Sequence, residues 1–270
     1  MRYRVYHIII YAVIFFFQTK AEGQSKDISR VLVNLYDRVL FTSSDAEKIR
    51  LNDSILLIID GYATSDSVFT HKFTNLRFLG QVSSSDARVK IITWNLVLRN
   101  GSNNYFCYII HRGRRGEKNQ VYKLKGEHLD NPASKDKIYS ADNWYGALYY
   151  AIQPCRKDYI ILGLDFRGMQ SRKIIDVLSF TTDGKIIFGK DFFLREKERK
   201  FREVIEYSSE SVVTLRFNSD KLIAFDHLAS FSTGDEESPE SFGSGLSFDG
   251  YIYKKGFWTF AQGVDARNKK

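Results

Sequence analysis

The sequence predicts an α+β protein that is predominantly β, with two N-terminal helices followed by an antiparallel β meander. Three observations lead to this prediction. Residues 27–41 carry apolar side chains at helical spacing, and Ser44 to Glu47 form the start signal of a second helix. From about Leu76 the chain changes to short runs rich in Val, Ile, Phe, Tyr and Thr, bounded by Gly, Asn, Asp or Ser. The connections between these runs are short, so neighbouring runs are expected to pair as antiparallel strands.

The first helix is predicted over residues 27–41, where one apolar stripe crosses an otherwise polar segment. The stripe consists of Ile28, Val31, Leu32, Leu35, Tyr36, Val39 and Leu40. The second helix is predicted from Ser44 toward Ile59: Ser44 can cap it, Glu47 can reach back, and Gly61 ends it. We expect both helices to pack their stripes on the β domain. The alternative is a docking arm for a helix of a partner protein.

Twelve strands are predicted in the rest of the chain: 88–98, 104–112, 120–125, 145–152, 158–166, 171–180, 185–193, 201–207, 212–217, 221–227, 247–253 and 257–261. Asn100-Gly101, Thr182-Asp183-Gly184 and Asn218-Ser219-Asp220 are hairpin-type turns. The continuous apolar runs Tyr159–Leu164 and Ile186–Phe188 are typical of strands covered on both faces. A sandwich, a barrel and propeller blades all satisfy this pattern.

Two segments are predicted to be exposed loops, residues 113–119 and residues 229–245. The second is long and acidic around Asp235. A loop of this length in a compact domain is either functional or a mobile surface segment, and we favour the surface segment.

The N-terminus resembles a secretory signal peptide. Arg2 and Arg4 precede an uncharged run, Ile8–Phe17, that is too short to span a bilayer as a helix. Small residues favour cleavage after Ala21 or Gly23, and a permanent membrane anchor is the weaker interpretation. No cysteine stands directly after the cleavage site, since the chain's cysteines are Cys107 and Cys155, which argues against a lipid anchor. We therefore predict a signal peptide over 1–21, a helical segment over 22–62 and a β-rich domain over 63–270.

The formal net charge of +8 falls to +5 when Arg2, Arg4 and Lys20 leave with the signal peptide. A net positive charge of this size permits an anionic partner, but a solvated basic surface is the simpler interpretation. Export makes nucleic acid an improbable partner. No later segment is long and apolar enough to cross a membrane, so we expect a soluble mature protein, periplasmic or extracellular, with an envelope protein or a glycan as its partner.

The two cysteines, Cys107 and Cys155, allow one disulfide in an oxidising compartment. Two buried thiols are the equally weighted alternative.

No strong catalytic motif is present. Gly243-Ser244-Gly245 is the nearest approach to a nucleophile elbow, but it lacks the strand-to-helix context. The histidines after the signal peptide, His71, His111, His128 and His227, have no metal-chelating spacing. We predict no metal site and no cofactor.

The catalytic candidates are His227, Asp226, Asp249 and Asp165. The first two lie in the segment Phe225-Asp226-His227-Leu228. Adjacent residues of a strand point to opposite faces, so Asp226 and His227 cannot pair with each other without a bulge. His227 could act as a general base with a carboxylate from Asp249 or Asp165. The simpler interpretation is that Asp226 caps a loop and His227 is a hydrogen-bonded rim residue.

Two further arrangements are possible. Asp165 could form a glycosidase-type carboxylate pair with Asp176 or Glu206. Trp144, Tyr145 and Tyr149, with Tyr150, could form a stacking platform for sugars or peptides. Because aromatic residues make up 15% of the chain, we favour a place for these rings in the core.

Residues from about Asp158 to Arg267 resemble a family of uncharacterised exported proteins from Bacteroidetes bacteria. The resemblance rests on the segments Ser171–Phe180, Asp183-Gly184-Lys185, Phe188-Gly189, Glu206-Tyr207-Ser208, Phe225–Leu228, Phe248–Tyr251 and Lys255–Trp258. It implies export and transfers no activity.

Together these features favour a non-enzymatic binding or structural module of the cell envelope. The alternative is a periplasmic hydrolase that uses carboxylates with His227.

Overall fold

The structure is a computed structural model that describes residues 28–127, 134–167, 170–231 and 241–267. The predicted signal peptide, His128 and the centre of the predicted acidic loop lie outside the described residues. The described chain divides into two compact units, one ending at Phe78 and the other beginning at Leu79.

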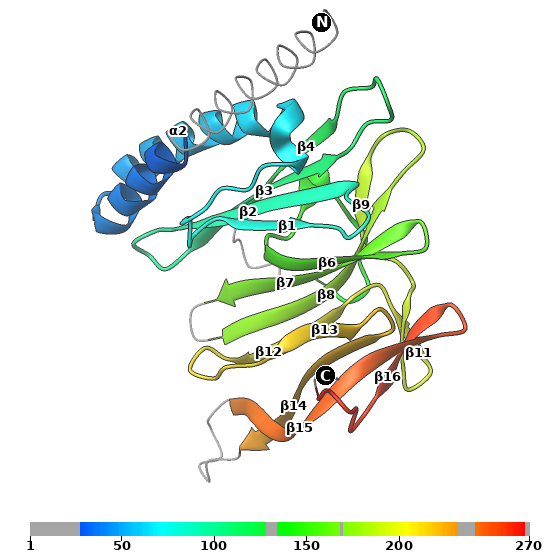
Figure 1. The fold of residues 1–270 in the computed structure, drawn as a ribbon. Helices are drawn as coiled ribbons and strands as arrows, with labels where there is room; N and C mark the ends of the chain where they lie inside the picture. The colour runs from blue at the N-terminus through cyan, green and yellow to red at the C-terminus, as the bar shows by residue number, and fades with distance from the viewer. Residues whose placement is uncertain (1–27, 128–133, 168–169, 232–240, 268–270) are drawn as a thin grey trace, which may run out of the picture. The chain divides into compact units, whose positions relative to one another are not determined.

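The N-terminal unit is helical (Figure 1). Residues 28–41 form a helix, followed by α2 (Asp45–Ala63) and a short 3₁₀ helix, η1 (Asp66–Phe69). Both predicted helices are thus present. In the described part of the chain, no helix combines the length and the apolar character needed to span a membrane.

The ends of α2 differ in detail from the prediction. Ser44 is the N-cap, and its side-chain oxygen accepts a hydrogen bond from the Glu47 N–H at 3.3 Å. The Glu47 carboxylate does not reach back, because it pairs with Arg38 and Arg50 at 3.0 and 2.8 Å. The helix also continues through Gly61 to Ala63, so that glycine weakens the last turn without ending it.

The second unit contains three β-sheets. The first holds, in order, β1 (Gly80–Ser83), β2 (Val89–Val97), β3 (Asn103–His111) and β4 (Gln120–Glu127). The second holds, in order, β5 (Tyr139–Ser140), β9 (Ile186–Phe188), β8 (Gln170–Phe180), β7 (Asp158–Arg167) and β6 (Leu148–Cys155). A further strand, β12 (Glu203–Ser208), also pairs with β8. A short 3₁₀ helix, η2 (Ala141–Asn143), follows β5.

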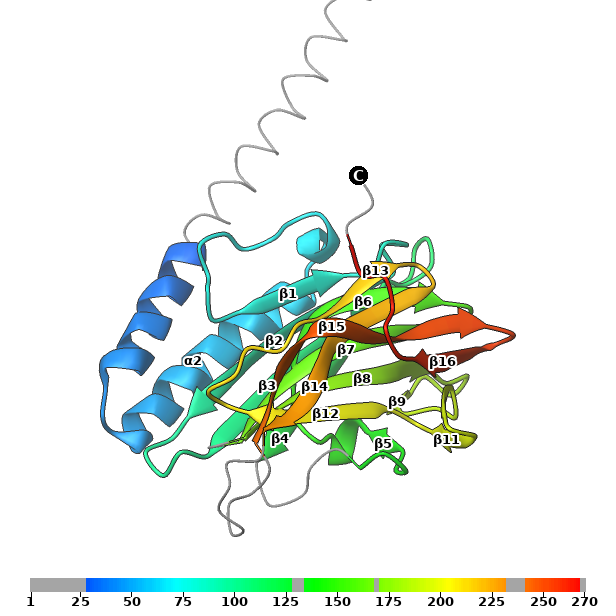
Figure 2. The ribbon, with the colours of Figure 1, turned by 90° about the horizontal axis from the view of Figure 1, so that it is seen from below.

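The third sheet has the order β11-β10-β16-β15-β14-β13. Its strands are β10 (Phe193–Arg195), β11 (Glu198–Lys200), β13 (Leu215–Ser219), β14 (Leu222–Phe231), β15 (Ser241–Lys254) and β16 (Phe257–Ala261). Figure 2 shows these sheets from below.

The second sheet is the middle layer, because its two faces contribute to two different cores. Tyr159 and Ile161 of β7 lie in a core shared with strands of the first sheet. Ile160 and Leu162 lie in a core shared with strands of the third sheet. Alternate residues of one strand thus serve opposite faces. This explains the continuous apolar run and confirms that the strand is covered on both sides. The sheets are stacked and open, and within the described residues they form no closed barrel.

Three predictions about the β domain, one of a strand, one of pairing and one of a loop, need correction. The predicted strand 185–193 is two elements, β9 and the start of β10, which belong to different sheets. β10 pairs with β16 in parallel, an exception to the predicted antiparallel pattern. The predicted loop 229–245 is strand at both ends, since β14 runs to Phe231 and β15 starts at Ser241. The predicted loop 113–119 is confirmed.

Cys107 and Cys155 are both buried free thiols. Cys107 lies in the core between the first and second sheets, and Cys155 lies in the core between the second and third. The middle sheet separates the two, which excludes a disulfide between them in this fold.

Candidate functional site

His227 and Asp249 lie side by side on β14 and β15. The distance between His227 Nδ1 and Asp249 Oδ2 is 2.8 Å. The β14–β15 register shifts between Asp226 and Leu228, so His227 sits at a β-bulge. A bulge changes the direction of a side chain. The sequence had named Asp249 as one of two possible carboxylate partners of His227, and the structure brings these two together.

Asp226 has a different role from its neighbour. Its carboxylate accepts a hydrogen bond from the Thr214 N–H at 2.8 Å, and its own N–H donates to the Thr214 carbonyl at 3.2 Å. It therefore ties β14 to the start of β13 and takes no part in the His227–Asp249 pair.

The pair is arranged as a general base would be, with a buried carboxylate behind a partly exposed imidazole. The Asp249 side chain is 9% exposed and also accepts a hydrogen bond from the Gly263 N–H, whereas the His227 side chain is 42% exposed. A carboxylate on Nδ1 stabilises the tautomer with its proton there and leaves Nε2 able to accept another.

Asp165 belongs to a separate ionic group. Arg172 lies between Asp165 and Glu206, with nitrogen–oxygen distances of 3.8 and 2.8 Å. The one guanidinium offsets one of the two negative charges, and its ion pairs link β7, β8 and β12. Asp165 is therefore positioned by Arg172 and not by His227.

Asp176 is the centre of a buried polar network that the sequence did not predict. Its Oδ2 accepts hydrogen bonds from Arg202 Nε at 2.9 Å and from the Tyr145 hydroxyl at 2.8 Å, and both ionic side chains are fully buried. Burial raises the pKa of the Asp176 carboxyl, while Arg202 opposes this rise. Arg202 also donates to the carbonyls of Ser134 and Phe188.

The predicted aromatic platform is the other half of this network. Trp144, Tyr145 and Tyr149 are only 4%, 6% and 1% exposed. The Trp144 Nε1–H donates to the Tyr149 hydroxyl, which is 2.8 Å from the Tyr145 hydroxyl. Burial raises the pKa of both tyrosines. These rings belong to the core, and their faces are not open to a ligand.

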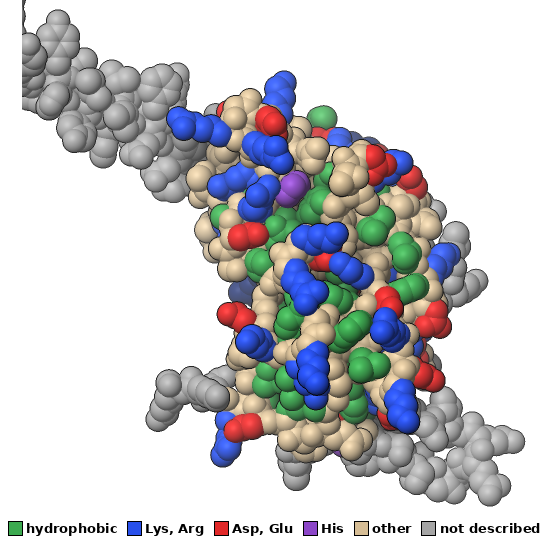
Figure 3. Space-filling view, turned by 90° about the vertical axis from the view of Figure 1, so that its right-hand side faces the viewer, with side chains coloured by type: hydrophobic (Ala, Val, Ile, Leu, Met, Phe, Trp, Pro, Cys, Tyr) green, Lys and Arg blue, Asp and Glu red, His purple; other side chains and the backbone are tan. Residues whose placement is uncertain are grey.

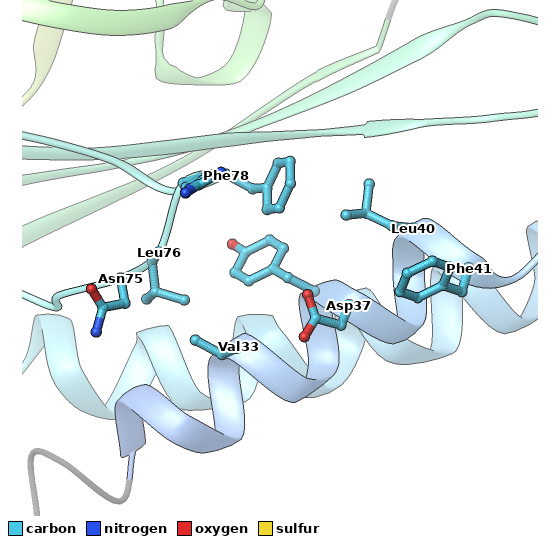
Figure 4. A pocket seen from close by; sticks show the side chains of 9 residues that line it. Val33, Asp37, Leu40, Phe41, Asn75, Leu76 and Phe78 are labelled. Carbon is cyan, nitrogen blue, oxygen red and sulfur yellow. The ribbon is translucent and has the colours of Figure 1, made fainter.

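A pocket of about 330 Å³ lies in the N-terminal unit. Figure 4 shows its labelled lining, which comes from one side of the first helix and from the segment that leads out of the unit. The lining consists of Val33, Tyr36, Asp37, Leu40, Phe41, Asn75, Leu76, Arg77 and Phe78. Leu40, Phe41 and Phe78 are 55%, 86% and 47% exposed, which is unusual for such side chains.

Tyr36 is the buried polar residue of this pocket. It is 4% exposed, and its hydroxyl has no hydrogen-bond partner in the described part of the chain. Burial raises the pKa of this phenol. The sequence placed Tyr36 and Leu40 on the apolar stripe, but it gave no sign that residues 75–78 would complete a pocket.

The described residues include no cluster of three or more potential metal-ligating side chains. Comparisons with protein-family models, with curated proteins and with solved structures give no match to this chain. The chemistry of its own residues is therefore the basis for a functional proposal.

Proposed function

We propose that the chain is an exported, non-enzymatic binding protein of the cell envelope, and that the pocket of the N-terminal unit holds a single-chain amphiphile. The head of this ligand carries an oxygen that accepts a hydrogen bond from Tyr36. The observation that carries the proposal is a pocket with a mainly apolar lining, with Asp37, Asn75 and Arg77 as its polar members, that contains one buried hydroxyl without a partner.

The energetics support a ligand of this kind. A buried hydroxyl without a partner costs about 1–3 kcal/mol, which an acceptor on a ligand would recover. The apolar part of a ligand would cover Leu40 and Phe78 at about 25 cal/mol per Å² of buried surface. The volume of the pocket is at the lower end of the range for small-molecule sites, which favours a short chain.

Octanoate and octylammonium are probes of equal chain length, and only octanoate carries an acceptor. They also differ in charge, and both an acid, Asp37, and a base, Arg77, line the pocket. We expect calorimetry to show octanoate binding to the full chain. Leu40→Asp should weaken this binding about tenfold or more through lost apolar contact. Leu57→Asp is the control, since Leu57 is another exposed leucine of the same unit, at 75%, and does not line the pocket.

Tyr36→Phe should remove the preference for octanoate over octylammonium and leave the fold intact, because it deletes only the hydroxyl. Absence of octanoate binding, or an equal effect of the Leu40 and Leu57 substitutions, contradicts the proposal. Export is checked separately by the intact mass of the protein from its bacterial host. A chain starting at Glu22 or Gln24 supports export, and an uncleaved chain starting at Met1 opposes it.

A hydrolase is the second candidate, favoured by the 2.8 Å contact between His227 and Asp249. If this pair is a general base, His227→Ala and Asp249→Asn should each lower the rate of hydrolysis of a nitrophenyl ester by about tenfold or more. Asp226→Asn is the control on the same strand. Unchanged hydrolysis in the first two variants, with loss of thermal stability, assigns the pair a structural role.

A further inference from the structure

Two neighbouring turns of the second unit carry four exposed cations. Arg156 and Lys157 connect β6 to β7, and Lys254 and Lys255 lie where β15 turns into β16. We call these four residues the basic corner. The turns are in close proximity, since a Cβ built on Gly256 would lie 3.1 Å from Arg156 Nη2. Figure 3 looks at this side of the molecule and shows Lys and Arg side chains spread over hydrophobic ones.

Two carboxylates near the basic corner, those of Asp158 and Asp191, already have partners. Asp158 ends the first turn, and its side chain, which is 4% exposed, pairs with Lys190. Asp191 pairs with Arg199 at 2.9 Å. In the described part of the chain, no ion pair joins any of the four corner residues to a carboxylate. The six cations and two carboxylates named here therefore leave a local charge of +4.

The backbone of both turns is unfavourable for the residues that it carries. Arg156 has φ 60° and Lys255 has φ 50°, in the left-handed region where glycine or asparagine is favoured. A cation occupies a strained position in each turn, although less strained residue types exist for that position. Such strain is retained more often at sites that bind ligands than elsewhere.

The aromatic rings near the corner are covered by guanidinium groups. The Arg156 guanidinium lies 5.9 Å from the centre of the Tyr253 ring, and that of Arg199 lies 4.7 Å from the centre of the Phe257 ring. The first of these contacts restricts the Arg156 side chain before any ligand arrives. A guanidinium held in place binds carboxylate or sulfate groups at a lower entropic cost.

We propose that the basic corner binds an acidic polysaccharide. Several fixed cations on two adjacent turns match a polymer with repeated carboxylates or sulfates. Insertion into a lipid surface would require apolar side chains at the turn tips, which here are Arg, Lys and Gly. Single-stranded nucleic acid would require open aromatic faces, and the rings here are covered.

The test is binding of the full chain to polygalacturonate, with DNA and with vesicles of anionic phospholipid as the other arms. The corner variant combines Arg156→Asn, Lys157→Gln, Lys254→Gln and Lys255→Asn. Asparagine tolerates positive φ, so both turns should keep their shape. The control variant removes the same number of charges elsewhere, through Gln substitutions at Arg99, Arg114, Arg115 and Lys118, all of which are exposed.

We expect the corner variant to bind polygalacturonate about tenfold or more weakly than the original chain, and the control variant to stay within about twofold. Binding by the original chain should weaken as salt is added. Equal losses in both variants, no binding by the original chain, or tighter binding to DNA or vesicles would each overturn the proposal. If the corner variant melts early, the pair Arg156→Asn and Lys255→Asn replaces it, with an expected loss of about threefold or more.

Discussion

His111 ends β3, and its imidazole stacks on the ring of Phe180 with 4.2 Å between the ring centres. Burial lowers the pKa of this histidine below its ordinary value of 6.5, and a hydrogen bond with Gln120 only partly opposes this effect. Asp86 and Arg88 are the charged groups that act on it, in opposite directions. Folding therefore favours the neutral form of His111.

The stability of the fold should depend on this proton. Below pH 6.5 the unfolded chain binds a proton on His111 before the folded chain does, so stability is fully present above 6.5 and is lost as the pH falls through the lowered pKa. The variant His111→Phe keeps a ring beside Phe180. We expect its melting temperature to fall less between about pH 7 and pH 5 than that of the original chain. Equal losses in the two proteins would show that other groups cause the decline.

Single residues also show what the sequence could predict about the candidate sites. The strand pattern predicted that Asp226 and His227 would face apart. The sequence also offered Asp249 as a possible partner of His227. It could not choose between Asp249 and Asp165, because that choice depends on the bulge at His227 and on the pairing of β14 with β15. The Arg202 network was not predictable, since no local pattern distinguishes an arginine that will be buried.

At the scale of elements, the buried pair of Asp176 and Arg202 connects β8 to the residue just before β12 and, through Tyr145, to the segment before β6. Three chain segments depend on one carboxylate. The pair therefore acts as a tie within the middle sheet, where both ions are fully buried.

Breaking this tie should be costly. Arg202→Met leaves Asp176 buried without its cation, and we expect a loss of about 3–5 kcal/mol in the free energy of unfolding, measured in urea. Asp176→Leu combined with Arg202→Met should recover part of this loss, because neither charge remains. Arg199→Met, which breaks the exposed pair with Asp191, is the control and should cost less than about 1 kcal/mol. Equal costs for the two single substitutions would contradict this role for the buried pair.

The longer elements were predictable, and the shortest were not. Helices and strands of eight or more residues give a periodic pattern that the sequence displays. β1, β5 and β11 have four, two and three residues, too few for any period to show. The split of residues 185–193 between two sheets has the same cause, because Gly189 and its neighbours carry no signal for a change of layer.

For the whole molecule, the sequence predicted the α+β class and a mostly antiparallel β domain, and the structure confirms both. The stacking of three sheets was not predictable, because a strand covered on both faces occurs in several architectures. The order of the third sheet depends on contacts between distant segments, such as Phe193 with Trp258. Export and the function of the chain stay predictions, to be tested by the intact mass and the binding experiments.

The position of β16 beside β10 has a consequence for folding while the chain is being synthesised. β16 is the last described strand in chain order, yet it lies inside the third sheet, between β10 and β15. Every other strand of that sheet is made first, and until β16 arrives β10 and β15 each present an open edge. Open edges recruit strands from other chains. A chain that stops before residue 257 should therefore aggregate or be degraded.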